Sequence, residues 1–311
     1  MPLVGLIDPR GSDALPHPGT LPPWVTTEQL LRVLERSELG DSHWTYEMAA
    51  AAIANVQDRG DMISTTAITT SCMRGEVLKR KEDYVGDLDE LHAALRGTLI
   101  HRSLELSANP NSIAEVRFFT TVDGIEISGA PDLLTPKSLI DYKVPADQNS
   151  VPFTYLYTNQ TEQLMINAFI CRNAEKWEDA DGNAAKLPFD PRQVLPESVG
   201  IVFIGPKRPK VMVSKKSTDV IGANGKPKKA RIPYIWSDEE VLKAIRPRLH
   251  LLKNALESYP EWPESWTDPD TGETYQAEDI WGGDQTWNCP GYPACKYTTC
   301  LAKRSPGMYA W

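Results

Sequence analysis

Apolar residues recur at helical spacing in several parts of the chain. Leu91, Leu95 and Leu99 follow such a spacing and predict a helix over residues 89–107. Two further helices start with capping boxes, at residues 26–29 and 237–240, in which a Thr or Ser precedes a Gln or Glu by three positions. The pattern as a whole predicts helices over residues 26–37, 45–57, 89–107, 160–176 and 238–259.

Short runs of β-branched and aromatic residues between turn signals predict strands. Residues 115–122, 125–134 and 139–144 are joined by tight turns, which predicts an antiparallel meander of three strands. Residues 199–204 predict a fourth strand. Runs near 210–214 and 232–236 flank a Gly-rich tip and predict a hairpin.

The alternation of these strands and helices predicts an α/β fold with a mixed sheet flanked by helices. We expect residues 1–60 to form a helical N-terminal appendage and residues 61–311 to form the main domain. Within that domain, residues 206–233 form the basic hairpin, and residues 260–311 form a tail rich in Cys and Trp.

The bulk composition fits a globular domain. The chain has 311 residues, of which 41% are hydrophobic and 24% charged. No apolar run approaches the roughly 20 residues of a membrane span, and the N-terminus lacks the basic start and apolar stretch of a signal peptide. A cytoplasmic protein without membrane contact is therefore expected.

The net charge of −9 is unevenly distributed. Residues 206–233 carry nine Lys or Arg and one acid, a local charge of +8 against −17 in the remainder. Overall charge therefore does not exclude a nucleic-acid partner, and the basic segment suits DNA phosphates. A solvated hairpin is the alternative. The candidate DNA-binding residues are Lys207, Arg208, Lys210, Lys215, Lys216, Lys226, Lys228, Lys229 and Arg231.

Two carboxylates and a lysine form the strongest candidate for catalytic chemistry. Side chains alternate along a strand, so Asp141 and Lys143 point to the same side. Asp132 ends the neighbouring run across a short turn, which brings it beside them. Carboxylates suit Mg²⁺, which completes its coordination with water and substrate phosphate. The alternative is a strand that carries ordinary solvent-facing charges.

Polar residues on two predicted helices add to this group. His101 and Glu105 lie four positions apart and share a helix face. Gln160, Gln163 and Asn167 form a polar stripe on the helix after the carboxylates. Amides on such a face can hold phosphates or a catalytic lysine, whereas a solvated helix face is the alternative.

The order of these residues resembles the motif series of the PD-(D/E)XK nuclease superfamily, in its RecB-like branch. The motifs G-x-x-x-H, G-x-x-D and D-x-K match Gly97 to His101, Gly129 to Asp132 and Asp141 to Lys143. The fourth motif, Q-x-x-x-Y, starts at Gln163 but has Asn167 where the family has Tyr.

The resemblance implies a restriction-endonuclease-like core and assigns a role to each matching residue. His101, Asp132, Asp141 and the backbone carbonyl of Tyr142 would bind Mg²⁺ or Mn²⁺. Asp132, Asp141, Lys143 and Gln163 would form the catalytic set, with Lys143 as the catalytic lysine and Gln163 supporting it or binding the DNA strand.

Five cysteines in a reducing compartment argue against disulfides. Cys289, Cys295 and Cys300 crowd the tail, and such a cluster predicts a metal site. With Cys72 ahead of the core, the arrangement is similar to that of iron–sulfur nucleases, which include AddB, CRISPR-associated adaptation nucleases and phage exonucleases. This implies a [4Fe–4S] cluster. Structural Zn²⁺ is the alternative, and Cys171 is expected to be a buried core residue.

The resulting expectation is a metal-dependent DNA exonuclease that acts on single-stranded ends in phage or bacterial recombination and repair. Two alternatives stay open. One is a non-catalytic nucleic-acid-binding accessory subunit with a structural iron–sulfur or zinc site. The other is a processing factor within a CRISPR adaptation complex.

Overall fold

The computed structural model describes residues 3–7, 24–36, 45–54, 62–70, 72–81, 84–86, 88–145, 156, 158–193, 196–205, 209–221 and 227–277. The chain divides into two compact units. The first comprises Met1–Asp61, Thr70–Thr98 and Pro247–Trp311, and the second comprises Met62–Thr69 and Leu99–Arg246. The predicted N-terminal appendage falls within the first unit.

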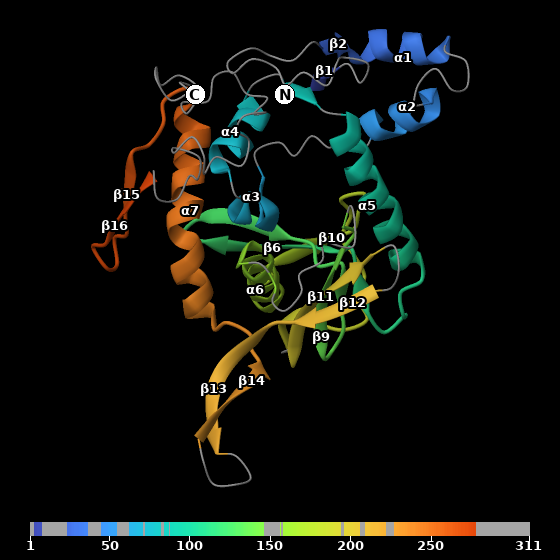
Figure 1. The fold of residues 1–311 in the computed structure, drawn as a ribbon. Coiled ribbons are helices and arrows are strands. Elements are labelled where there is room, and N and C mark those ends of the chain that lie inside the picture. The colour runs from blue at the N-terminus through green and yellow to red at the C-terminus, as the bar shows by residue number, and fades with distance from the viewer. Residues whose placement is uncertain are drawn as a thin grey trace. The chain divides into compact units, whose positions relative to one another are not determined.

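The second unit is a mixed α/β body with two main sheets and a two-stranded ribbon (Figure 1). A four-stranded sheet has the order β10-β6-β7-β3, and a five-stranded sheet has the order β12-β11-β9-β8-β5. The strands of the first are β3 (Ile63–Ser64), β6 (Arg117–Val122), β7 (Ile125–Gly129) and β10 (Lys176–Glu178). Those of the second are β5 (Ile113–Ala114), β8 (Leu133–Leu134), β9 (Ser138–Lys143), β11 (Ser198–Ile204) and β12 (Pro209–Val213).

The predicted three-strand meander is wrong in one respect. Residues 125–134 do not form one strand, because the chain leaves the first sheet after β7 and enters the second sheet at β8. Pro131 lies in the break, and its lack of an N–H group prevents a continuous ladder there. The break places Asp132 immediately before β8, where it can reach β9.

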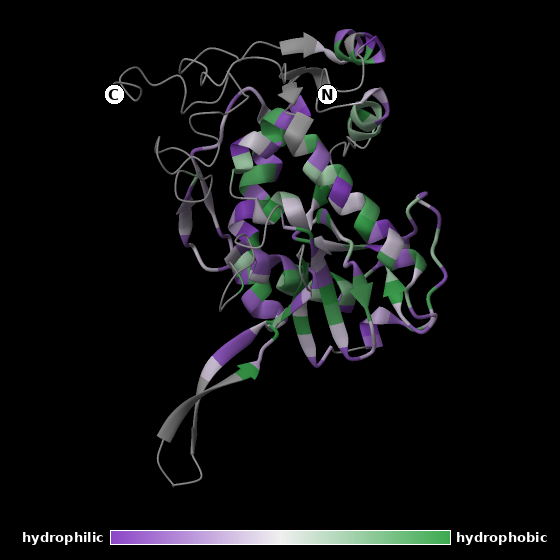
Figure 2. Ribbon diagram, turned by 45° about the vertical axis from the view of Figure 1, so that its right-hand side comes forward, coloured by the Kyte–Doolittle hydropathy of each residue, from purple (hydrophilic) through white to green (hydrophobic). Residues whose placement is uncertain are grey.

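Helix α6 (Thr158–Arg172) is the core helix of this unit. Every residue from Leu164 to Cys171 is buried, and the helix packs against β6 and β7 of one sheet and β9 and β11 of the other. Helices buried all round are apolar all round. Asn167, which was placed in the polar stripe, is buried, so a solvated face is excluded for it, and Cys171 is buried as predicted. In Figure 2 many strand residues of this unit are green, that is, hydrophobic.

The buried Asn167 packs closely against Gly129 of β7. A Cβ at Gly129 would lie 2.5 Å from Asn167 Oδ1 and 2.9 Å from Thr65 Oγ1. The hydroxyl of Thr65 donates to Asn167 Oδ1 at 2.8 Å. Gly129 therefore permits a close approach between β7, α6 and the short helix α3 (Thr65–Thr69).

Strands β9 and β11 are parallel, and α6 lies in the connection between them. Such a βαβ crossover needs apolar strands that are covered by helix. Val199, Ile201 and Phe203 of β11 are accordingly buried. Strand β12 then pairs antiparallel with β11 and forms the edge of the sheet.

The two strands of the basic hairpin have different bounds from those predicted. Residues 209–213 belong to the sheet as β12, and the ribbon is formed instead by β13 (Lys215–Ile221) and β14 (Pro227–Pro233). The seven register pairs run from Lys215 opposite Pro233 to Ile221 opposite Pro227. The short run of β-branched residues at 218–221 is the signal that the prediction passed over.

In the first unit, helices α1 (Thr27–Glu35) and α2 (Tyr46–Ala54) pack on a small apolar cluster. Leu30 and Leu34 contribute from α1, and Ala49 and Ala52 from α2. The predicted capping box is present, because Thr26 and Gln29 exchange backbone-to-side-chain hydrogen bonds. The other elements that lie wholly in this unit are β1 (Leu3–Ile7), β2 (Trp24–Thr26), β4 (Tyr84–Gly86), α4 (Met73–Lys81), β15 (Ser265–Thr267) and β16 (Thr274–Gln276).

Two long helices contain the boundary between the units, α5 (Leu88–Leu106) and α7 (Asp238–Ser258). Both were predicted from sequence to within a residue. The capping box of α7 is present, since Ser237 and Glu240 bond reciprocally. Among the described residues, no helix combines the length and apolar character needed to cross a membrane.

Candidate metal centre

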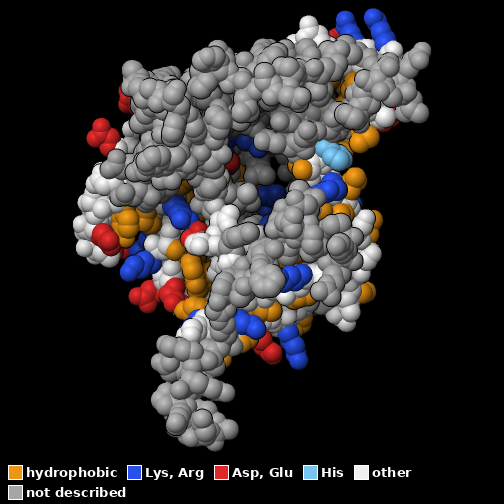
Figure 3. Space-filling view, in the orientation of Figure 1, with side chains coloured by type: hydrophobic (Ala, Val, Ile, Leu, Met, Phe, Trp, Pro, Cys, Tyr) orange, Lys and Arg blue, Asp and Glu red, His pale blue; other side chains and the backbone are white. Residues whose placement is uncertain are grey.

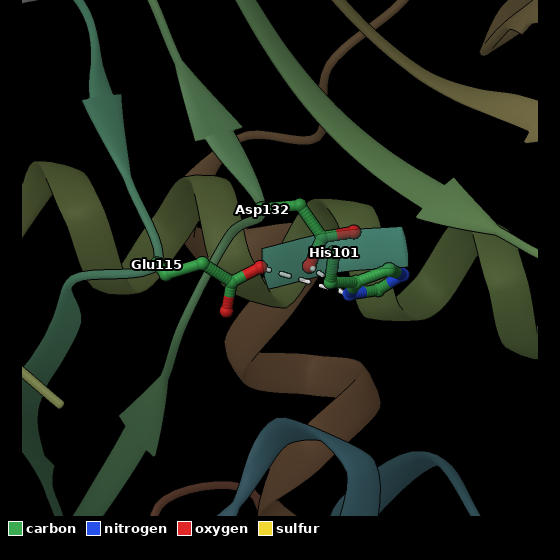
Figure 4. A group of neighbouring side chains, drawn as sticks. All are labelled: His101, Glu115 and Asp132. Carbon is green, nitrogen blue, oxygen red and sulfur yellow. Dashed lines mark ion pairs between the residues drawn. The ribbon is translucent and has the colours of Figure 1, made fainter. Parts of the chain in front are cut away.

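Three potential metal ligands from separate parts of the second unit converge on one point (Figure 4). The Nδ1 atom of His101 lies 3.3 Å from Asp132 Oδ1 and 3.6 Å from Glu115 Oε1. One ligand atom from each residue lies within 4.8 Å of the others. Two carboxylates and an imidazole form a donor set of the kind that binds divalent cations.

The position of Asp132 is set by strand pairing. Leu133 of β8 pairs with Ile140 of β9, so the residue before β8 lies beside the residue after Ile140. The backbone N–H of Tyr142 donates a hydrogen bond to Asp132 Oδ2. The carboxylate is thereby fixed at β9, as the sequence prediction required, and it is buried.

Glu115 was missed by sequence analysis. It lies between β5 and β6 with φ 54°, a left-handed conformation that non-glycine residues adopt rarely. Such backbone conformations often occur at functional sites. Its position before an apolar strand is the only sequence signal, because Glu115 belongs to no motif. The carboxylate expected beside His101, Glu105, instead pairs with Arg102 at 2.5 Å.

Asp141 and Lys143 lie next to this group on β9. Lys143 Nζ is 2.8 Å from Asp141 Oδ2, so the two side chains point to the same side of the strand. Asp141 is only 3% exposed, and Lys143 is the partner of its Oδ2 atom. Burial raises the pKa of Asp141 to about 6, against the opposing effect of Lys143. A buried carboxylate oxygen with one cationic neighbour still has capacity for a further cation.

His101 carries the positive charge that this cluster needs. The neighbouring carboxylate of Asp132, followed by that of Glu115, raises the pKa of His101 to about 10. Burial raises the pKa of Glu115. Without a metal ion, the protonated imidazole thus offsets part of the negative charge of the two carboxylates. A divalent cation would compete with the protonated imidazole for the same carboxylate oxygen atoms.

The backbone carbonyl of Tyr142 also lies at the cluster. His101 Nε2 is 3.0 Å from Tyr142 O, so the carbonyl predicted as a ligand borders the predicted histidine. Gln163 is half-buried on α6, which contacts β9. The structure therefore brings His101, Asp132, Asp141, Tyr142 and Lys143 to one end of β8 and β9.

The site fits Mg²⁺ or Mn²⁺ by the chemistry of its donors. Oxygen ligands suit both ions, and Mn²⁺ accepts an imidazole nitrogen more readily than Mg²⁺ does. His101, Glu115 and Asp132 would hold the ion, with Asp141 and the Tyr142 carbonyl adjacent. A second cluster of three such ligands is not found among the residues that the structure describes.

The remaining predicted sites are only partly described. Cys72 precedes α4 and its Sγ accepts a hydrogen bond from the Gly75 N–H at 3.3 Å. Cys289, Cys295 and Cys300 lie outside the described residues, as do Lys207, Arg208 and Lys226. The strands place the backbone, but not the side chains, of Lys228, Lys229 and Arg231. Lys210, Lys215 and Lys216 are described, and Lys216 Nζ lies 3.7 Å from the centre of the Tyr234 ring.

Comparison with known proteins gives little further information. No protein-family model matches the chain, and no curated protein matches it. A solved structure described as "Crystal structure of SSO0001" is similar to it with 16% sequence identity and a TM-score of 0.36. The similarity covers 72% of this chain and 85% of that one. A similarity this low supports no statement about function.

Proposed function

We propose that the protein is a metal-dependent deoxyribonuclease of the PD-(D/E)XK type, with a restriction-endonuclease-like core. The observation that carries the proposal is the convergence of His101, Glu115 and Asp132 beside Asp141 and Lys143. The substrate would be DNA, cut exonucleolytically from single-stranded ends. The cytoplasmic location expected from the sequence is part of the proposal.

Each residue has a definite task in phosphodiester hydrolysis. The carboxylates of Asp132 and Glu115 and the ring of His101 would bind the ion, and Asp141 would add a further carboxylate beside it. A bound Mg²⁺ or Mn²⁺ would supply positive charge to the phosphate oxygens as charge develops on them. Lys143, 2.8 Å from Asp141, can orient the attacking water and offset the same charge.

The partial exposure of Lys143 supports the role proposed for it. Lys143 is 34% exposed whereas Asp141 is buried, so the ammonium lies between the acidic cluster and the solvent. A substrate phosphate that approaches from solvent would meet the cation first. Because the backbone N–H of Tyr142 holds the Asp132 carboxylate beside β9, that group needs little reorganisation when the substrate binds.

The proposal includes a [4Fe–4S] cluster held by Cys72, Cys289, Cys295 and Cys300. Its support is the spacing of the cysteines in the sequence. Structural Zn²⁺ on the same residues is the alternative. Either would link the start of the nuclease core to the end of the chain.

The experiment that tests the function is digestion of end-labelled DNA. Single-stranded DNA, duplex DNA and RNA of the same sequence are incubated with the protein over a titration of Mg²⁺ and of Mn²⁺. We expect metal-dependent release of short products from single-stranded DNA ends. Binding without cleavage at every metal concentration would contradict the proposal and favour a non-catalytic accessory subunit.

A further inference from the structure

The ribbon of β13 and β14 is an unusual feature of the second unit. Its seven paired residues on each strand span roughly 20 Å at about 3.3 Å per residue. Within the described part of the chain, no third strand pairs with it, and Figure 1 shows it extending away from the five-stranded sheet. A two-stranded ribbon contributes little to stability on its own. The ribbon is therefore better explained by binding than by folding.

The root of the ribbon is firmly attached to the unit that holds the metal centre. The N–H of Tyr234 donates to the Ser214 carbonyl at 3.1 Å, and the N–H of Ser214 donates to the Val199 carbonyl of β11 at 2.9 Å. On the same side, Lys216 Nζ lies over the Tyr234 ring. Strand β11 pairs directly with β9, which carries Asp141. Because Val199 pairs with Leu139, the ribbon leaves the body near the start of β9, two residues before Asp141.

A second set of contacts holds the chain where it leaves β14. Arg172 of α6 donates to the Trp236 carbonyl at 3.2 Å and to Asp238 at 2.6 Å. Asn173 donates to the other Asp238 oxygen at 3.0 Å. Both ends of the ribbon are therefore anchored to the core, which suits an arm that holds a ligand at a fixed distance from the site.

The composition of the ribbon indicates which ligand it binds. Residues 215–233 contain six Lys or Arg, one acid, and no Trp, Tyr or Phe. Proteins that bind single-stranded DNA combine basic grooves with aromatic side chains on which the bases stack. A ribbon with cations and no aromatic residue lacks that means of binding. Figure 3 shows further Lys and Arg side chains, with a few acidic ones, near the root of the ribbon.

Duplex DNA matches the ribbon in both charge and size. Its phosphates attract Lys and Arg regardless of sequence. Its major groove, about 12 Å wide, admits a two-stranded β-ribbon. We propose that the β13–β14 ribbon binds the duplex part of a partly double-stranded DNA substrate, whose single-stranded end is cut at the metal centre. This inference rests on the proposed function and names the substrate class as a duplex with a single-stranded overhang.

The register of the ribbon allows a clean test. Residues 218–230 are removed, and Ser217 is joined to Arg231 by an Asn-Gly turn, which suits a two-residue hairpin. The pairs of Lys215 with Pro233, Lys216 with Ile232 and Ser217 with Arg231 are kept, so the root is preserved. Cleavage of a single strand is compared with cleavage of the same single-stranded end attached to a duplex of roughly 20 base pairs, about two helical turns.

We expect the wild type to cleave the partial duplex about tenfold more efficiently than the single strand at low salt, because the duplex adds phosphate contacts. The shortened variant should lose this preference and still cleave the single strand as the wild type does. An unchanged preference in a folded shortened variant would overturn the proposal. An equal loss of cleavage on both substrates would also overturn the proposal.

A triple substitution in the full-length ribbon tests the same proposal in case the shortened protein misfolds. Lys226→Gln, Lys228→Gln and Lys229→Gln together should lower the slope of log affinity against log salt on the partial duplex by up to about 3. The charge-matched control substitutes Lys186, Lys243 and Lys253, none of which lies on the ribbon. An equal loss of slope in the control, or an unchanged slope in the ribbon variant, would overturn the proposal.

Binding in Ca²⁺ separates this inference from the proposed function. If the wild type cleaves no DNA at any metal concentration, the nuclease proposal fails. The affinity for the partial duplex, measured by fluorescence anisotropy, still reports on the ribbon in that case. A higher affinity for the partial duplex than for the single strand, lost when the ribbon is shortened, would support binding of duplex DNA by the ribbon even without cleavage.

Discussion

His101 Nδ1 lies 3.3 Å from Asp132 Oδ1, although one residue belongs to helix α5 and the other to the turn before β8. Asp132 in turn accepts a hydrogen bond from the N–H of Tyr142, whose carbonyl faces His101 Nε2 at 3.0 Å. Helix, turn and central strand are thereby linked through polar contacts at one point. This linkage holds the site together before any ion or substrate binds.

Glu115 is expected to be a metal ligand. Glu115→Gln removes one of the two carboxylate charges beside His101, so Mn²⁺ affinity measured by calorimetry should fall about tenfold or more. Glu105→Gln is the matched control, since Glu105 pairs with Arg102. Equal Mn²⁺ affinity of Glu115→Gln and the wild type would remove Glu115 from the site.

Gly129 is expected to tolerate no side chain. Gly129→Ala places a methyl group against the buried Asn167 and Thr65, which should lower the free energy of unfolding by about 1–3 kcal/mol. Gly97→Ala is the control in a helix, because a Cβ at that position has no neighbour within 4 Å outside the backbone of its own helix, and it should stabilise by up to about 1 kcal/mol. Equal effects of the two substitutions in urea unfolding would show that β7 and α6 are not in close contact.

The contact of Asp238 with Arg172 and Asn173 should make stability depend on pH. Partial burial acts to raise the pKa of Asp238, but hydrogen bonds from Asn173 and Arg172 outweigh it and lower the pKa below its usual value. A carboxyl group with a lowered pKa in the folded state stabilises the protein above its unfolded pKa of about 3.9. That stabilisation is lost as pH falls through the folded pKa.

Asp238→Asn should therefore lower the urea midpoint at pH 7, by an amount equivalent to roughly 1 kcal/mol or less because Asp238 is 45% exposed. The difference from the wild type should shrink towards zero below the folded pKa. Glu239→Gln, an exposed neighbour in the same helical turn, is the control. A difference that is constant from pH 7 down to strongly acidic pH would contradict the ionic contribution.

The cysteine proposal predicts a coloured protein. Purified without oxygen, the protein should be brown and contain iron and sulfide. Cys72→Ser should remove the colour as fully as Cys289→Ser does, whereas Cys171→Ser should keep it. Cys171 is a suitable control because it is buried on α6, and burial raises the pKa of its thiol to about 12. Bound zinc without iron would replace the cluster by a structural zinc site, and four free thiols would exclude both.

Much of the fold could be predicted because helices and capping boxes are local features. The capping boxes at Thr26 and Ser237 both form as predicted. The switch of the chain between two sheets at Pro131 was missed, because only three residues separate β7 from β8 and the prediction joined the two runs into one strand. Which sheet a strand joins depends on long-range contacts, and these leave no local pattern.

The candidate site was partly predictable for the same reason. Asp141 and Lys143 share a side of β9 because of strand alternation alone, and the turn before β9 brings Asp132 to them. Glu115 could not be predicted, because a left-handed backbone conformation outside regular structure directs its side chain to His101. The burial of Asn167 was not predicted, because burial of a polar residue against Gly129 depends on tertiary packing.

The most direct test of the metal centre is the rate of Mn²⁺-dependent DNA cleavage in purified single-residue variants. Asp132→Ala, Asp141→Ala and Lys143→Ala should each slow cleavage by at least about a hundredfold while the fold and DNA affinity are kept. Asp181→Asn, an exposed acid in a turn, should cleave at the rate of the wild type. Metal-dependent cleavage at the wild-type rate in Asp132→Ala or Asp141→Ala would contradict the assignment of this site.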